Sequence, residues 1–293
     1  MIDANVPHRV LKAGNFSYIV AVGDSEVVCR SRKKVKNNGE ILAGDMVYLE
    51  QVGEEAVIKG VVPRKNFLIR PAIANIDQVV MMISPLPAPD FMLIDKVILN
   101  CHAKHIDCIL CVNKTDIKDL TGEVVRQYAG EVGDIVTVNV KNQQINAIIP
   151  LLKDKITCLA GQSAAGKSSL INLITGKKQC EVGQLSEKIQ RGKNTTTAVS
   201  LVPVGENSYV ADTPGFSLLD VFDIDADDLD LYYNVYVDLS DKCRYRRCKH
   251  IAEPGCEVKR RVDAGLLSKE RYERYKQITS ELQSKNKYKG GLL

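Results

Sequence analysis

Short apolar runs separated by glycines fill the first 70 residues of the chain. β-like stretches occur at 17–22, 26–29 and 45–49, and no long helical periodicity crosses them. Glycines punctuate these runs at positions 14, 23, 39, 44, 53 and 60. Several short strands at this spacing predict a small β-barrel. Pro63 and Pro71 then bracket a basic segment that we interpret as a linker.

From Asp77 onward, apolar runs alternate with segments of helical spacing. The segment 91–102 predicts a helix, and 145–152 predicts a short one in spite of Pro150. Buried strands are predicted at 79–83, 108–112, 135–138, 156–159 and 208–211. Strands that alternate with helices are typical of a parallel α/β sheet.

Beyond about residue 220 the chain turns acidic, and then basic and cysteine-bearing. Two charged helical segments, 258–267 and 269–283, precede a lysine-rich tail at 284–293 that we expect to be loose. We therefore predict a multidomain protein with an all-β barrel over 1–70, an α/β domain over 71–222 and a mostly α domain over 223–293.

Composition says little about binding partners but indicates in which cellular compartment the protein is expected. The net charge of +4 is too weak by itself to indicate nucleic acid. No apolar run reaches membrane-spanning length, and the N-terminus lacks the pattern of a signal peptide, so we expect a cytoplasmic protein without a membrane partner. Nine cysteines in such a compartment are expected to be thiols or metal ligands rather than disulfides.

A phosphate-binding loop is predicted at 161–168, where GQSAAGKS follows an apolar strand and precedes a helical start. Gly161 and Gly166 let the backbone curl so that its N–H groups point at a phosphate. We expect Lys167 to reach the β- and γ-phosphates and the hydroxyl of Ser168 to bind Mg²⁺. The loop would also contact nucleotide through Gln162, Ser163, Ala164, Ala165 and Ser169. A chance match in a glycine-containing turn is the weaker interpretation.

A guanine-reading motif, NKTD, stands before this loop and not after it. Its aspartate can accept hydrogen bonds from the ring N–H and the exocyclic amine of guanine, a donor pair that adenine lacks. Alone, the motif would be better interpreted as a polar turn after a strand. Combined with the phosphate loop, it predicts a GTP site formed by Asn113, Lys114, Thr115 and Asp116. The order of the two motifs indicates a GTPase that is cut and rejoined between them.

Two further segments complete the predicted site. In DTPG, Asp212 can hold a water of Mg²⁺, and the backbone N–H of Gly215 can contact the γ-phosphate. In the threonine run at 195–197, Thr196 is preferred over Thr195 for closing on Mg²⁺ and the γ-phosphate. Phe216 stands where many GTPases place a water-orienting glutamine, so we expect slow intrinsic hydrolysis that needs outside help.

Four metal ligands are predicted near the end of the chain, with the spacing C-x4-C-x-H-x5-C. Three thiolates and one imidazole fill a tetrahedral Zn²⁺ shell, which makes the ion structural. The ligands are Cys243, Cys248, His250 and Cys256. A basic set between them, a basic run at 30–36 and the lysine-rich tail together favour a large polyanion such as ribosomal RNA over plain solvated loops.

These motifs, in this order, resemble the circularly permuted, small-subunit-dependent ribosomal GTPases of bacteria. Besides the motifs above, the resemblance rests on the segments 62–66, 70–71 and 74–78. It implies an OB-fold barrel, a circularly permuted GTPase domain and a zinc-containing C-terminal domain. It also implies GTP hydrolysis to GDP, stimulated by the small ribosomal subunit during its late maturation, with binding to ribosomal RNA. We further expect a monomer off the ribosome.

The chain departs from the family pattern at two positions. Ala164 stands where the family usually has glycine, and Asn194 stands where a histidine usually precedes the threonines. Asn194 can hydrogen-bond the attacking water but cannot act as a general base. Two alternatives therefore stay open: a nucleotide-gated ribosome-binding module with negligible hydrolysis, and a P-loop ATPase or kinase with an accidental NKTD.

Overall fold

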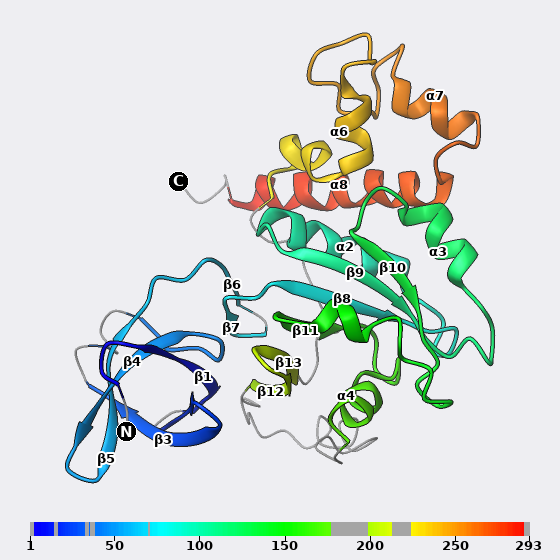
Figure 1. Cartoon of the computed structure of the whole chain (residues 1–293). Helices are drawn as coiled ribbons and strands as arrows, with labels where there is room; N and C mark the ends of the chain where they lie inside the picture. Colours follow the sequence, from blue (N-terminus) through cyan, green and yellow to red (C-terminus); the bar gives the residue numbers. More distant parts are fainter. Residues whose placement is uncertain are drawn as a thin grey trace.

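A computed structural model describes residues 3–14, 17–32, 35, 39–69, 71–176, 199–212 and 224–289, with the side chains of 212 and 286–289 excepted. Three bodies follow one another along the chain: a barrel, a sheet with helices on both faces, and a helical C-terminal region (Figure 1). No helix among these residues is both long and apolar enough to cross a membrane.

The N-terminal barrel is closed by five strands. β1 pairs with β2 and β4, and the circuit continues through β2–β3, β3–β5 and β4–β5. Alternate residues such as Val20, Leu49 and Ile58 fill the interior and are fully buried. The strands are β1 (Pro7–Ala13), β2 (Tyr18–Val22), β3 (Ser25–Ser31), β4 (Met46–Val52) and β5 (Glu55–Val61). The predicted barrel is therefore present, with β1 and β5 as strands that the pattern missed.

The central sheet has the strand order β10-β9-β8-β11-β13-β12, parallel throughout except that β12 runs antiparallel to β13. The carboxyl ends of the parallel strands therefore meet at one edge, where ligands bind in such sheets. The strands are β8 (Gln78–Ile83), β9 (Asp107–Val112), β10 (Asp134–Thr137), β11 (Ile156–Ala160), β12 (Ser200–Gly205) and β13 (Ser208–Asp212).

Helices cover both faces of this sheet, which explains its unbroken apolar runs. In β8, Met81 packs with the core under α2 and α3, whereas Met82 packs with the core under α4. The side chain of Asp90 begins α2 by accepting a hydrogen bond of 3.0 Å from the backbone N–H of Leu93. The elements are α2 (Phe91–Ala103), α3 (Thr121–Tyr128), α4 (Lys167–Thr175) and a 3-10 turn, η1 (Ile149–Leu152). The helix predicted at 145–152 shrinks to η1, because Pro150 has no N–H for an interior turn and stands at its start.

The barrel joins the central sheet through a strand pair as well as through the connector. Lys12 of β1 pairs with Ser200 of β12, and Ser200 pairs in turn with Asp212 of β13. The predicted linker is also not a plain linker, because its strand β6 (Phe67–Leu68) pairs with β7 (Ile73–Ala74) just beyond Pro71, and the residues of β7 are fully buried.

The C-terminal region packs tyrosines against α2 and α8. Tyr233 and Tyr236 stack at 4.9 Å between ring centroids, and Tyr275 meets Tyr233 edge-on at 5.0 Å. Leu99 of α2 belongs to the same core. The elements are η2 (Ala226–Tyr232), α6 (Asn234–Ser240), α7 (Glu257–Asp263) and α8 (Lys269–Lys289). Our expectation of a loose tail from 284 was wrong as far as Lys289, because α8 continues to that residue.

Candidate functional site

The predicted phosphate loop joins β11 to α4 at the carboxyl edge of the sheet. Gly161 (φ 131°) and Gly166 (φ 107°) both have backbone conformations that disfavour a side chain. A Cβ at Gly161 would also lie 2.5 Å from the carbonyl oxygen of Met82. Ala164 has a φ of 63°, which places a Cβ in the left-handed region where glycine is favoured. The loop therefore leads into the N-terminus of α4, where free N–H groups favour an anion.

The side chain of Lys167 lies across the loop. Its Nζ donates to the carbonyl oxygens of Gly161 at 2.6 Å and Gln162 at 2.8 Å. Burial lowers the pKa of Lys167. Ser168 and Ser169, the next residues of α4, are half-buried, while Ser163 is exposed at the tip of the loop. The ammonium group and the start of the helix thus lie on one small surface.

Two hydrogen bonds join the NKTD segment to this loop. Asn113, which follows β9 and is 2% exposed, donates from Nδ2 to the carbonyl oxygen of Ala165 at 2.9 Å. Lys114 donates from Nζ to the carbonyl oxygen of Ala164 at 2.8 Å and to that of Leu86 at 2.7 Å. The two motifs stand about 50 residues apart in the sequence and are in direct contact in the fold.

A third segment, at 139–141, completes the surroundings of Asp116 and was missed in the sequence. Asn139 donates from Nδ2 to Oδ1 of Asp116 at 3.0 Å, and Nζ of Lys141 lies 3.8 Å from Oδ2. The backbone N–H of Val140 donates to Oδ1 of Asn113 at 3.1 Å. Their position in the chain could have indicated this role. They directly follow β10, which is parallel to β9, so both strands end at the same edge of the sheet. Thr115 lies half-buried between its neighbours.

The remaining predicted residues lie at or beyond the limits of the described chain. Asp212 is the last residue of β13. The residue before it, Ala211, pairs with Cys158 of β11, so the backbone of Asp212 lies at the edge of the sheet where the phosphate loop begins. Thr195, Thr196, Asn194 and Gly215 lie outside the described residues, as does Phe216.

The four predicted metal ligands converge. One ligand atom from each of Cys243, Cys248, His250 and Cys256 lies within 4.8 Å of the others. The Nδ1 atom of His250 is 3.7 Å from the sulfur of Cys243 and 3.3 Å from that of Cys256. Ligand atoms around a tetrahedral Zn²⁺ with Zn–S bonds of about 2.3 Å lie about 3.5–3.8 Å apart, so the donors fit such an ion in kind and spacing. The cluster could therefore hold a metal ion.

Hydrogen bonds from α8 hold the loop that carries these ligands. Tyr272 donates its hydroxyl to the carbonyl oxygen of His250 at 2.6 Å, and Tyr275 donates to that of Lys249 at 2.7 Å. Within this loop, the guanidinium carbon of Arg244 lies 5.6 Å from the ring centre of Tyr245, which is 44% exposed. The segment that carries the predicted ligands therefore also presents a basic and an aromatic side chain together.

Comparison with known proteins decides the family. A family model described as RsgA GTPase matches residues 61–222, which is more than half of the chain. The chain belongs to the RsgA GTPase family. This is a family of GTP hydrolases, and the alternative of a P-loop ATPase or kinase is thereby set aside.

Relatives match over nearly the full length. A protein of Ruminiclostridium cellulolyticum named small ribosomal subunit biogenesis GTPase RsgA is 35% identical, with 94% of this chain and 93% of the relative covered. A protein of the same name from Caldanaerobacter subterraneus is also 35% identical, over 95% and 96% of the two chains.

Solved structures agree with this assignment. YjeQ from Thermotoga maritima matches with a TM-score of 0.78 at 29% identity, covering 95% of this chain and 98% of that one. YloQ, described as a circularly permuted GTPase, matches with a TM-score of 0.78 at 30% identity over 96% of each chain. The inverted order of motifs in this chain is therefore a property of the fold that it shares with these proteins.

Proposed function

We propose that this GTPase binds GTP where the NKTD segment meets the phosphate loop. Asp116 would accept hydrogen bonds from guanine, while Asn113 and Lys114 would fix the base-reading loop against the phosphate loop. The hydrogen bond from Asn113 to Ala165 carries the proposal, because it sets the distance between base and phosphates. Asn139 would orient the carboxylate of Asp116.

Hydrolysis would use Mg²⁺ held by the hydroxyl of Ser168 and by Asp212 through water. Lys167 would then bind the β- and γ-phosphates, and Thr196 with Gly215 would close on the γ-phosphate. Asn194 would hydrogen-bond the attacking water. Since neither Phe216 nor Asn194 can act as a general base, we expect slow turnover until a partner completes the site.

The partner that we propose is the small ribosomal subunit, during its late maturation. The names of the full-length relatives support this choice. Ribosomal RNA would be bound by Arg30 and Arg32 at the barrel surface and by the exposed surface of Arg244 and Tyr245 over the metal cluster. A cation beside an exposed ring suits phosphate contact together with base stacking. The protein would act in the cytoplasm and as a monomer off the ribosome.

The metal cluster would hold Zn²⁺ with a structural role. Four protein ligands leave no position for a substrate, so the ion would supply a cross-link between the 243–250 loop and the start of α7. The exposed RNA-binding side chains would then be displayed from a rigid base.

GTP turnover, titrated separately with purified small and large subunits, tests the proposal. We expect small subunits to stimulate turnover and large subunits to have no effect, and we expect Lys167→Ala to abolish it. Turnover that small subunits leave unchanged would favour a nucleotide-gated ribosome-binding module. Stimulation by large subunits alone would contradict the choice of partner.

A further inference from the structure

Helix α2 belongs to two hydrophobic cores at once. Ile94 and Ile98 pack into the core beneath the central sheet, whereas Leu99 packs with the C-terminal tyrosines. Every residue from Val97 to Cys101 is buried, which is unusual for a helix on the face of a sheet. The helix therefore forms the interface between the GTPase domain and the metal-binding domain and contributes side chains to the core of each.

A buried ion network fastens the outer face of α2 to α8. The side chain of Asp95 has no exposed surface and is paired with two guanidinium groups, those of Arg271 (Nε to Oδ1, 3.2 Å) and Arg274. Arg271 continues to Glu131, another fully buried carboxylate, at 2.8 Å. The two buried carboxylates thus balance the two guanidinium groups in charge, and the planar guanidinium groups fix the directions of the ion pairs.

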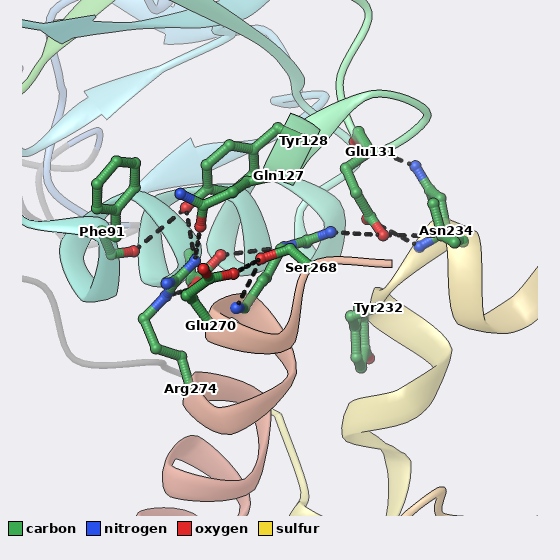
Figure 2. A network of polar contacts seen from close by, with 12 residues as sticks. Phe91, Gln127, Tyr128, Glu131, Tyr232, Asn234, Ser268, Glu270 and Arg274 are labelled. Carbon is green, nitrogen blue, oxygen red and sulfur yellow. Dashed lines mark hydrogen bonds and ion pairs between the residues drawn. The ribbon is translucent and has the colours of Figure 1, made fainter. Parts of the chain in front are cut away.

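Further hydrogen bonds join neighbouring polar groups to Arg274 and Glu131 (Figure 2). Arg274 also donates to Oε1 of Gln127 at 2.8 Å and to the hydroxyl of Tyr128 at 3.2 Å. Glu131 accepts from the backbone N–H of Asn234, at the start of α6, at 3.0 Å. The network therefore links residues of α2, α3, α6 and α8.

The two ends of this connection touch the two functional centres. At the start of α2, the backbone N–H of Asp90 donates to Oε1 of Gln162 in the phosphate loop at 3.1 Å. At the far side, α8 holds the metal-ligand loop through the hydroxyl of Tyr272, one residue after Arg271. A continuous path of hydrogen bonds, ion pairs and two helices therefore joins the phosphate loop to the metal cluster.

We propose that Asp95 is a positioning residue that couples the phosphate loop to the metal-binding domain. Docking of RNA on the metal-binding domain displaces α8, and Arg271 and Arg274 carry α2 with it. The contact between Asp90 and Gln162 then changes the phosphate loop. Because a coupling between two sites is reciprocal, the nucleotide also changes the docking face. This deepens the proposed function and rests on it for the identity of the docking partner.

The test compares Asp95→Asn and Arg274→Gln, which each remove one charge of the network, with Lys96→Gln. Lys96 is a matched control, because its ammonium group forms a partly exposed ion pair of 2.8 Å with Glu281 between the same two helices. GDP binding and bound zinc confirm that each variant is folded, and Arg274→Gln decides the question where Asp95→Asn does not fold.

Two measurements are made on each protein. The first is amide hydrogen exchange of α8 with GDP and with a non-hydrolysable GTP analogue, in the absence of ribosomes. We expect the exchange of α8 to differ between the two nucleotides in the wild type and in Lys96→Gln, but not in the network variants. The second is the ratio of subunit-stimulated to intrinsic turnover, which should fall about tenfold in the network variants and less than about twofold in the control.

The outcomes separate this inference from the proposed function. Small subunits that fail to stimulate the wild type would refute the proposed function, while the exchange measurement would still decide the coupling. Exchange of α8 that is the same with both nucleotides in the wild type would overturn the coupling. So would a folded network variant that keeps both the nucleotide-dependent exchange and the stimulation ratio.

Discussion

Substituting alanine for Gly166 tests whether the contact between the base reader and the phosphate loop forms the GTP site. Gly166 precedes α4 with a φ of 107°, and a Cβ there would lie 2.3 Å from Nδ2 of Asn113. That approach is far inside van der Waals contact, so the amide of Asn113 must move. Its movement would break the bonds to Ala165 at 2.9 Å and from Val140 at 3.1 Å.

The magnitude has two parts. A side chain in the left-handed region costs about 1–2 kcal/mol. Leaving the buried amide of Asn113 without its partners costs about 1–3 kcal/mol more. We therefore expect Gly166→Ala to lower the free energy of unfolding by about 2–5 kcal/mol. We also expect nucleotide binding to weaken, and a loss of about 3 kcal/mol of binding free energy corresponds to an affinity about 100-fold lower.

Gly176→Ala is the control, because it separates backbone strain from the steric clash. Gly176 ends the same helix with a φ of 65°, and a Cβ there would meet nothing within 4 Å. It should therefore lose only about 1–2 kcal/mol of stability and bind GDP like the wild type. Denaturant unfolding measures the stability of each variant, and titration with a fluorescently labelled GDP analogue measures its nucleotide affinity. Nucleotide affinities that are equal in the two variants would refute the role of the Asn113 contact.

Four further predictions concern single groups. Asp116→Asn should weaken GTP relative to xanthosine triphosphate, measured by competition; an unchanged guanine preference would argue against this residue as the base reader. Ala164→Gly should raise the free energy of unfolding by about 1 kcal/mol, because the relief of strain exceeds the added freedom of the unfolded chain; a destabilised variant would show that the strain is absent. The hydroxyl of Tyr233 is buried and finds no hydrogen-bond partner among the described residues, so Tyr233→Phe should leave stability unchanged or raise it by about 1 kcal/mol. A loss of that size on chemical unfolding would reveal a partner. Cys248→Ser should release bound zinc and lower the thermal midpoint of the C-terminal tyrosine core, and a variant that retains zinc would exclude Cys248 as a ligand.

Several features could be predicted from the sequence because neighbouring residues specify them. The phosphate loop needs Gly161 and Gly166 at a fixed spacing between a strand and a helix, and the structure has that strand, loop and helix. The predicted metal ligands likewise fall within one short segment, so their spacing was enough to predict that their side chains meet.

Other features depend on contacts between distant segments. Asn139 was missed because its role depends on β10 lying beside β9, and a local pattern gives no neighbour order. The extension of α8 through a lysine-rich segment was missed for a related reason. The preceding turns of α8 pack Ile278 and Leu282 into the tyrosine core, and a helix that packing has already formed gains one backbone hydrogen bond for each residue added.

The sequence alone therefore determined the inverted order of the GTPase motifs and the four side chains that converge as a candidate metal site, because loop geometry at fixed spacing is a local property. Only the tertiary structure decided that Asp95 and Arg274, far apart in the chain, form a buried pair. Hydrophobic periodicity marks which face of a helix is buried but not what it is buried against. A charged residue within such a face can stay charged only if the fold brings it a partner, and that partner can come from any part of the chain.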